Sequence, residues 1–170
     1  MRARKRLHLK IPRGVDTGSR LRLGGKGDGG SQGGPAGDLY VVLHVRAHEL
    51  FERRGDDLYC EVPVPFDVAA LGGEIEVPTI DGYAKLKLAP GTENGKVFRL
   101  RGRGMPDVEG YGRGAMHVRV VIEVPARLNA AQKKILREFT EKSDLSDYPR
   151  LNAMREMAAQ FYERKQAIRH

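Results

Sequence analysis

The sequence predicts a mainly β protein in which two tandem β modules, the first incomplete, are followed by C-terminal helices. Three observations lead to this fold class. Much of the chain alternates apolar and polar residues as half-buried strands do, one stretch recurs 77 residues later, and the pattern becomes helical after Pro125. With 170 residues, 40% of them hydrophobic, the chain is long enough to bury a core.

Five segments carry the strand pattern, and glycine-rich turns separate them. They are Leu7–Ile11, Leu39–Val45, Glu74–Val77, Ala84–Leu88 and Met116–Ile122. Because successive side chains of a strand point to opposite faces, each segment is expected to bury one face and expose the other.

The repeat aligns Leu9–Val45 with Leu86–Ile122 without a gap. Six of its eleven identical positions are glycines, which indicates that the same turns are built twice. The counterpart of the front half of the second module, Phe51–Tyr83, would precede Met1. We therefore expect a piece of a longer protein, or a first module that a partner completes, because an unpaired strand edge invites another chain. The predicted domains are 1–48, 49–126 and 127–170.

Helical spacing begins at Asn129, a predicted N-cap with Gln132 in capping-box register. The helix is expected to run to about Lys142. It carries an apolar stripe together with the residue before its cap: Leu128, Ile135, Leu136 and Phe139. A breaker segment, 143–149, precedes a second helical stretch with its own stripe: Leu151, Met154, Ala158 and Phe161.

Charge and composition narrow the function classes. The net charge of +8 divides into +8 for residues 1–27, −4 for 28–126 and +4 for 127–170, so the body is mildly acidic. A nucleic-acid groove would place its cations on the folded surface, so a basic scaffold that binds through residues 1–26 is kept as an alternative. No apolar run approaches the roughly 20 residues of a membrane span. A single cysteine, Cys60, excludes a disulfide framework and fits a reducing, cytoplasmic setting.

Candidates for catalysis or metal binding are weak, and we expect no enzyme activity, cofactor or metal. His44 and His48 have the four-residue spacing that serves a metal on a helix, but His44 falls in a predicted strand, where four residues span about 13 Å. Cys60 is predicted to be a half-buried packing residue. The loop 24–30 is glycine-rich but lies between strands and lacks the features of a phosphate-binding loop.

Several long motifs resemble the C-terminal region of DnaJ-type heat-shock co-chaperones. They are Asp57–Val64, Ala69–Gly82 and Lys96–Gly104, with shorter matches at Ile11–Gly18 and Pro35–Val41. The resemblance implies two β-sandwich-like domains that bind unfolded polypeptides, a terminal helix that forms a homodimer, and a DnaK-type ATPase as the partner of full-length members. The J domain's His-Pro-Asp and the family's cysteine repeats do not occur here. ATPase stimulation and zinc binding are therefore not expected.

The resemblance also indicates site residues. Carried over by motif, Leu7 and Val41 fall at positions of the family's peptide groove, and Leu9 and Leu43 alternate onto the same faces. The alternative is that all four are core residues, because alternation identifies a buried face without saying what covers it. The stripe of Leu128, Ile135, Leu136 and Phe139 is expected to form the dimer. A third hypothesis is a dimeric remnant without an activity of its own.

Overall fold

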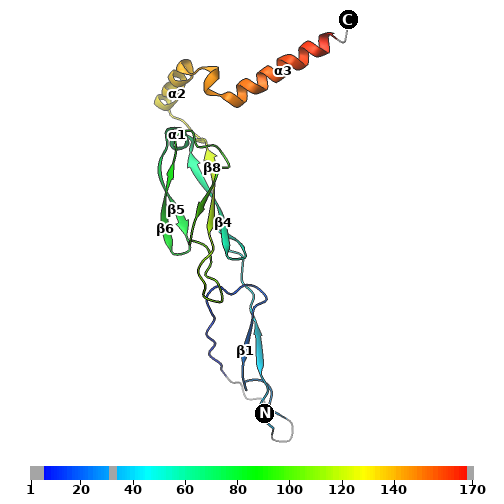
Figure 1. The fold of residues 1–170 in the computed structure, drawn as a ribbon. Coiled ribbons are helices and arrows are strands. Elements are labelled where there is room, and N and C mark those ends of the chain that lie inside the picture. Colours follow the sequence, from blue (N-terminus) through cyan, green and yellow to red (C-terminus); the bar gives the residue numbers. More distant parts are fainter. Residues whose placement is uncertain (1–5, 31–33, 168–170) are drawn as a thin grey trace. The chain divides into compact units, whose positions relative to one another are not determined.

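The structure is a computed structural model that describes residues 6–30 and 34–167, and the chain divides into two compact units, Met1–Val124 and Pro125–His170. The described part of the first unit is built mainly from strands and includes the short helix α1, and the second unit is built from helices (Figure 1). The predicted fold class is confirmed: the protein is mainly β, with two successive β modules and C-terminal helices. The domain boundaries at residues 48 and 126 stay predictions. Within the described ranges, no helix is long and apolar enough to cross a membrane.

The second module contains one mixed sheet and one antiparallel sheet. The larger has the strand order β3 (Glu52–Arg54), β4 (Asp57–Pro65), β8 (Met116–Glu123) and β7 (Val97–Leu100). The smaller pairs β5 (Gly73–Thr79) with β6 (Gly82–Leu88). The predicted strands Glu74–Val77, Ala84–Leu88 and Met116–Ile122 are therefore confirmed.

One hydrophobic cluster joins these two sheets and forms the core. Along β4 the even-numbered side chains Leu58, Cys60, Val62 and Val64 are all buried, and the intervening ones are not. The cluster adds residues from the other strands and from the segments beside them: Phe51, Ala69, Val77, Leu86, Leu88, Met116, Val118 and Val120. Each buried Val or Leu contributes about 1.5–3 kcal/mol to folding, so this cluster stabilises the whole module.

The middle of the large sheet is a parallel pair. β4 and β8 align from Leu58 opposite Met116 to Pro65 opposite Glu123, and parallel neighbours require a long connection. That connection contains α1 (Phe66–Leu71) and the β5–β6 hairpin before β7. β8 is therefore covered on both of its edges, by β4 and by β7.

The other edge of β4 is protected by prolines. The Leu58 amide donates to the Ala115 carbonyl at 2.9 Å, so the even-numbered backbone groups of β4 face β8 and the odd-numbered ones face away. β3 covers this outer edge only as far as Tyr59. Beyond it lie Pro63 and Pro65, which have no N–H to offer to another strand. The second module is thus protected against strand addition there.

The first module is a two-stranded antiparallel sheet of β1 (Arg20–Leu23) and β2 (Leu39–Val42). The prediction of a strand at Leu7–Ile11 is wrong, and β2 ends at Val42 instead of continuing to Val45. The physical reason is missing pairing. In the second module, β6 is held by β5 and the full length of β8 by β4, whereas the described residues offer no equivalent neighbour to the first module.

The repeat seen in the sequence is a repeat in strand register. Leu21 lies opposite Val41 in the first module, and Phe98 lies opposite Val118 in the second, which is the same pair displaced by 77 residues. β7 and the first half of β8 are thus the counterparts of β1 and β2. The sequence predicted the equivalence of the two stretches, but β1 and β7 were not among its predicted strands.

The glycine turns are repeated as well. The Gly18 amide donates to the Leu43 carbonyl at 2.9 Å, and the Gly95 amide donates to the Val120 carbonyl at 2.8 Å. Both glycines have φ in the left-handed region, +90° and +83°, which L side chains rarely adopt. Glycine at these positions therefore serves the turn in both modules.

The second unit consists of helices with a short turn between them. α2 (Ala130–Lys142) begins at the predicted cap: the Gln132 amide donates to the Asn129 side chain, and the Asn129 amide donates to the Gln132 side chain. The breaker holds a 3₁₀ turn, η2 (Leu145–Asp147). Pro149, assigned to the breaker from sequence, is instead the first residue of α3 (Pro149–Ala167), a position where its missing N–H costs nothing.

Candidate functional site

The outer edge of β2 is the most conspicuous unpaired feature of the first module. Leu43 exchanges backbone hydrogen bonds with the segment leading into β1, so the odd-numbered residues of β2 face β1. The N–H and C=O groups of Tyr40 and Val42 consequently face the other side, where the described residues add no further strand to the sheet. The equivalent edge of β8 carries β4 over eight residue pairs. Unlike the outer edge of β4, this one has no proline in β2.

Exposed apolar side chains lie on β2 and in other segments of the first module. Tyr40 and Val42 are 59% and 49% exposed, and Ile11 and Val45 are similarly open. In the described part of the chain before Ala47, no apolar side chain is fully buried. The first module therefore presents, on one hairpin, free backbone groups and apolar side chains together, which is the combination that extended peptides bind.

The four residues predicted for peptide binding fall in two segments. Val41 lies in β2 and Leu43 directly follows it, and both are half-buried. Leu7 is exposed and Leu9 half-buried, on a segment without regular secondary structure. The assignment of these four residues to a peptide groove stays a prediction.

The repeat clarifies the alternative that these residues are core. Their counterparts 77 residues later are Ala84, Leu86, Val118 and Val120. Leu86, Val118 and Val120 are buried in the core cluster, and Ala84 packs against it. The four predicted positions thus have a core role in the complete module. In the first module they lie on surfaces that the described residues leave partly uncovered. Under either hypothesis, peptide groove or core, another apolar group must contact these side chains along β2.

The residues predicted for dimerisation lie on or beside α2. Ile135 and Phe139 are 65% and 58% exposed, Leu128 and Leu136 are half-buried, and no described residue of α2 is fully buried. Ile135 and Phe139 are four residues apart, so they lie next to each other on the helix surface. This spacing gives α2 an apolar stripe, and its role in a dimer stays a prediction.

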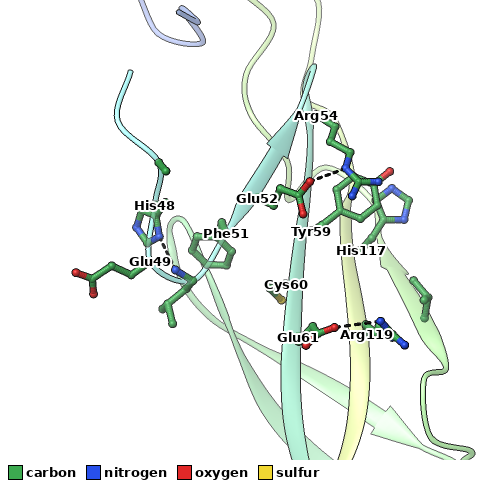
Figure 2. A pocket seen from close by; sticks show the side chains of 13 residues that line it. His48, Glu49, Phe51, Glu52, Arg54, Tyr59, Cys60, Glu61, His117 and Arg119 are labelled. Carbon is green, nitrogen blue, oxygen red and sulfur yellow. Dashed lines mark hydrogen bonds and ion pairs between the residues drawn. The ribbon is translucent and has the colours of Figure 1, made fainter. Parts of the chain in front are cut away.

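A pocket on the outer face of the large sheet was not predicted from sequence. It has a volume of about 640 Å³ and lies between the segment 47–51 and the outward side chains of β4, β7 and β8 (Figure 2). The rings of Tyr59 and His117 are stacked there with centroids 4.5 Å apart, and Arg54 lies over Tyr59 at 4.6 Å. In the strand predicted at Met116–Ile122, His117 alternates with the buried Met116 and Val118, but nothing in the sequence indicated its stacked partner.

Asp57 fixes His117 on this face. Its carboxylate lies 2.9 Å from His117 Nε2 and accepts a second hydrogen bond from the Ala115 amide at 2.7 Å. The pKa of Asp57 is lowered below its ordinary value, most strongly by the hydrogen bond with His117 and next by that from the Ala115 amide. These contacts join the start of β4 to the start of β8 and stabilise the parallel pair.

The remaining candidates from sequence add no chemistry. Cys60 is buried, and desolvation raises the pKa of its thiol, which disfavours a nucleophilic thiolate. His44 lies beyond the end of β2, so its placement in a strand is wrong. Within the described ranges, no group of three His, Cys, Asp or Glu side chains could hold a metal ion. Arg2, Arg4 and Lys5 of the basic alternative lie outside the described residues.

Comparison with known proteins agrees with this architecture. The family model described as DnaJ C terminal domain matches residues 1–125, which is well over half of the chain. The chain belongs to the DnaJ C-terminal domain family. The tandem repeat lies within the residues that this family model matches.

Several relatives of the DnaJ family align with most of the chain. The chaperone protein DnaJ of Bacillus cytotoxicus is 54% identical over 147 residues, which cover 86% of this chain and 40% of the relative. That of a Geobacillus species is 54% identical over 141 residues, 83% of this chain and 37% of the relative. That of Bacillus cereus is 52% identical over 147 residues. The chain therefore spans about 40% of the length of these curated relatives.

Proposed function

We propose that this chain binds non-native polypeptides as the substrate-binding part of a DnaJ-like co-chaperone and forms a homodimer through α2. The observation that carries the first half is the open edge of β2, with the free backbone groups of Tyr40 and Val42 beside exposed apolar side chains. Membership of a family whose relatives are named as chaperones supports the same role.

Strand addition explains how such a site accepts many sequences. A client segment that pairs with β2 gains main-chain hydrogen bonds, which every residue except proline can make. Apolar client side chains then contact Leu7, Leu9, Val41 and Leu43. The β4–β8 pair in the second module is the geometric template for such a complex, because β8 is the counterpart of β2. Affinity is weak at any one segment and depends on apolar content.

The dimer increases this weak affinity. Two chains joined through Ile135, Phe139 and their neighbours present two first modules to one long unfolded client. The second contact is then intramolecular, so avidity rises without new interactions. The action is non-catalytic and needs no cofactor. A DnaK-type ATPase in the cytoplasm is proposed as the partner of the whole protein.

The binding experiment uses an unfolded model protein and fluorescence anisotropy. Leu9→Asp and Val41→Asp place a charge on the apolar surface and are expected to weaken binding strongly, while the second module stays folded. Val124→Asp is the matched control, because Val124 is 72% exposed and lies away from β2 in sequence. Unchanged binding in both variants would contradict the groove assignment.

The same experiment separates the alternative functions. A basic nucleic-acid scaffold requires binding of oligonucleotides that collapses steeply with salt and disappears when Arg2, Arg4, Lys5 and Arg6 are neutralised. Binding of unfolded protein with modest salt dependence supports the chaperone role. A folded dimer that binds neither ligand contradicts the chaperone role and identifies a remnant without activity.

The dimer is tested by light scattering. Phe139→Asp introduces a charge into the apolar stripe of α2 and is expected to give monomers, as is removal of residues 128–170. Ala130→Asp introduces the same charge on a different side of α2, within its first turn, where an acidic residue is tolerated. Dimers that persist without residues 128–170 would show that another surface forms the interface.

A further inference from the structure

One arginine side chain connects the first module to the second. Arg53 lies in β3, the first strand of the second module, and its guanidinium donates to three backbone carbonyls, each at 2.7 Å. Nη2 bonds Gly14, Nη1 bonds Val15, and Nε bonds Gly55. Two of these acceptors belong to the loop before β1, 38 and 39 residues away in sequence.

Two carboxylates, one from each module, lie close to the same guanidinium. Asp16 Oδ2 is 3.6 Å from Nε, and Asp56 Oδ1 is 3.8 Å from Nη2. The Arg53 side chain is only 16% exposed, so solvent screens these attractions less than at an open surface. Without the cation, Asp16 and Asp56 would repel each other, and the carbonyls of Gly14 and Val15 would lose these two donors.

The same loop touches a second segment of the second module. Gly14 is buried with φ +81°, and a Cβ at this position would overlap the Pro106 carbonyl oxygen and lie 3.2 Å from the Val108 amide nitrogen. The Met105 amide in turn donates to the Asp56 carbonyl at 2.8 Å. Three segments therefore meet around Arg53: the loop 14–16, the turn 53–56 and the loop 105–108.

The repeat shows what is unusual about this arrangement. The counterpart of Gly14 is Gly91, whose amide donates to the Ala70 carbonyl at 3.0 Å, and the neighbouring Thr92 amide donates to Ala69 at 2.9 Å. The second module thus holds this loop with backbone bonds to its own helix α1. The first module holds the equivalent loop through a side chain of the other module.

We propose that Arg53 is a positioning residue that fixes the orientation of the first module relative to the second. Its planar guanidinium holds its N–H donors in a rigid fork that reaches three carbonyls at once, while its charge attracts the two flanking carboxylates. A lysine keeps the charge but concentrates its donors at one nitrogen, so it cannot hold all three acceptors. If the proposed function holds, this joint also sets the orientation of the β2 edge, and of a client segment bound to it, relative to the second module.

The joint is measured with spin labels and no client, so its outcome is independent of the proposed function. Arg20→Cys in β1 and Tyr83→Cys in β6 place labels on exposed positions of the two modules. Cys60 is buried, and label incorporation into the unsubstituted protein checks that it stays unmodified. Pulsed electron resonance then gives the distribution of distances between the labels.

Arg53→Ala is expected to replace a narrow distance distribution with a broad one, and Arg53→Lys to give an intermediate width. Arg54→Ala is the matched control, because Arg54 is the adjacent arginine, is 63% exposed and pairs with Glu52 within its own module. Thermal unfolding of each variant checks that the second module keeps its cooperative transition. A distribution in Arg53→Ala and Arg53→Lys as narrow as that of the parent, or equal broadening in Arg54→Ala, overturns the proposal.

Discussion

Val41 in the first module and Val118 in the second occupy the same position of the same hairpin, but Val118 is fully buried and Val41 only half-buried. The difference comes from their neighbours. Val118 lies in β8 between β4 and β7 and belongs to the core cluster, whereas β2 has only β1 as a partner among the described strands. One sequence motif thus serves as core in one module and as open apolar surface in the other.

Truncation of these two valines is therefore expected to have unequal effects on stability. Val118→Ala removes two buried methyl groups and leaves a cavity, so the free energy of unfolding should fall by about 2 kcal/mol. Val41→Ala should lower it by less than about 1 kcal/mol, because its side chain is already partly in water. Urea unfolding of both variants measures the difference. Equal losses would mean that the first module is packed as tightly as the second.

Two glycines at equivalent positions support the hairpins by close backbone approach. A Cβ on Gly27 would lie 2.7 Å from the Asp38 carbonyl oxygen, and one on Gly104 would lie 2.8 Å from that of Ala115. Gly104→Ala is expected to destabilise the second module by more than about 2 kcal/mol, since backbone must shift. Gly102→Ala is the control: it has φ +68° but open space, so it should cost only about 1 kcal/mol.

Much of the fold could be predicted because local patterns and the repeat agreed. The glycine turns of the repeat, the alternation of the strands at 74–77, 84–88 and 116–122, and the Asn129 cap all act over short distances, and these were found where the sequence predicted them. The segment Leu7–Ile11 failed for a non-local reason. Alternation reports that a face can be buried, but a strand also needs a paired neighbour, and β5 provides one for the second module only.

The lowered pKa of Asp57 leads us to expect that the free energy of unfolding decreases at acidic pH. Its pKa is lowered in the folded protein, mainly by the hydrogen bond with His117, so the ionised carboxylate favours folding. This contribution is fully present above the unfolded pKa of about 3.9 and is lost as the pH falls through the lower folded value. Unfolding curves between pH 6 and pH 2 should show a smaller decrease for Asp57→Asn than for the parent protein.

The cause of this shift is checked separately by following the Asp57 carboxyl carbon in an NMR titration. His117→Ala removes the largest cause and should raise the pKa of Asp57, while the hydrogen bond from the Ala115 amide still holds it partly down. An unchanged titration in His117→Ala would refute the assignment of the hydrogen bond.

The candidate sites were harder to predict than the fold. Asp57 and His117 are 60 residues apart, and Arg53 and Gly14 are 39 apart, so neither contact leaves a periodic signal in the sequence. The contact of Asp57 with His117 depends on the parallel pairing of β4 with β8, and that of Arg53 with Gly14 depends on the packing of the loop before β1 against the second module. The repeat predicted which residues are equivalent, and only the pairing of strands shows that equivalent residues have different surroundings.

The capping box of α2 predicts a contribution to the helix, and through it to the proposed dimer. Asn129→Ala removes the acceptor for the Gln132 amide and should destabilise α2 by about 1 kcal/mol, whereas Asn129→Ser should retain most of the cap. Far-ultraviolet circular dichroism against temperature measures helix loss, and light scattering against concentration measures dimer dissociation. Loss of helix without any change in dissociation would separate α2 from the interface.

The thiol of Cys60 is expected to react slowly in the folded protein. It lies in the core cluster at 6% exposure, and desolvation raises its pKa, so both access and the thiolate fraction are reduced. An aromatic disulfide reagent at pH 8 should label it at the rate of rare opening of the second module, and immediately in denaturant. Val118→Ala, which loosens the same cluster, should accelerate labelling about tenfold for each 1.4 kcal/mol of stability lost, because labelling follows the open population. Labelling of the native protein at the rate of a free thiol would contradict the burial of Cys60.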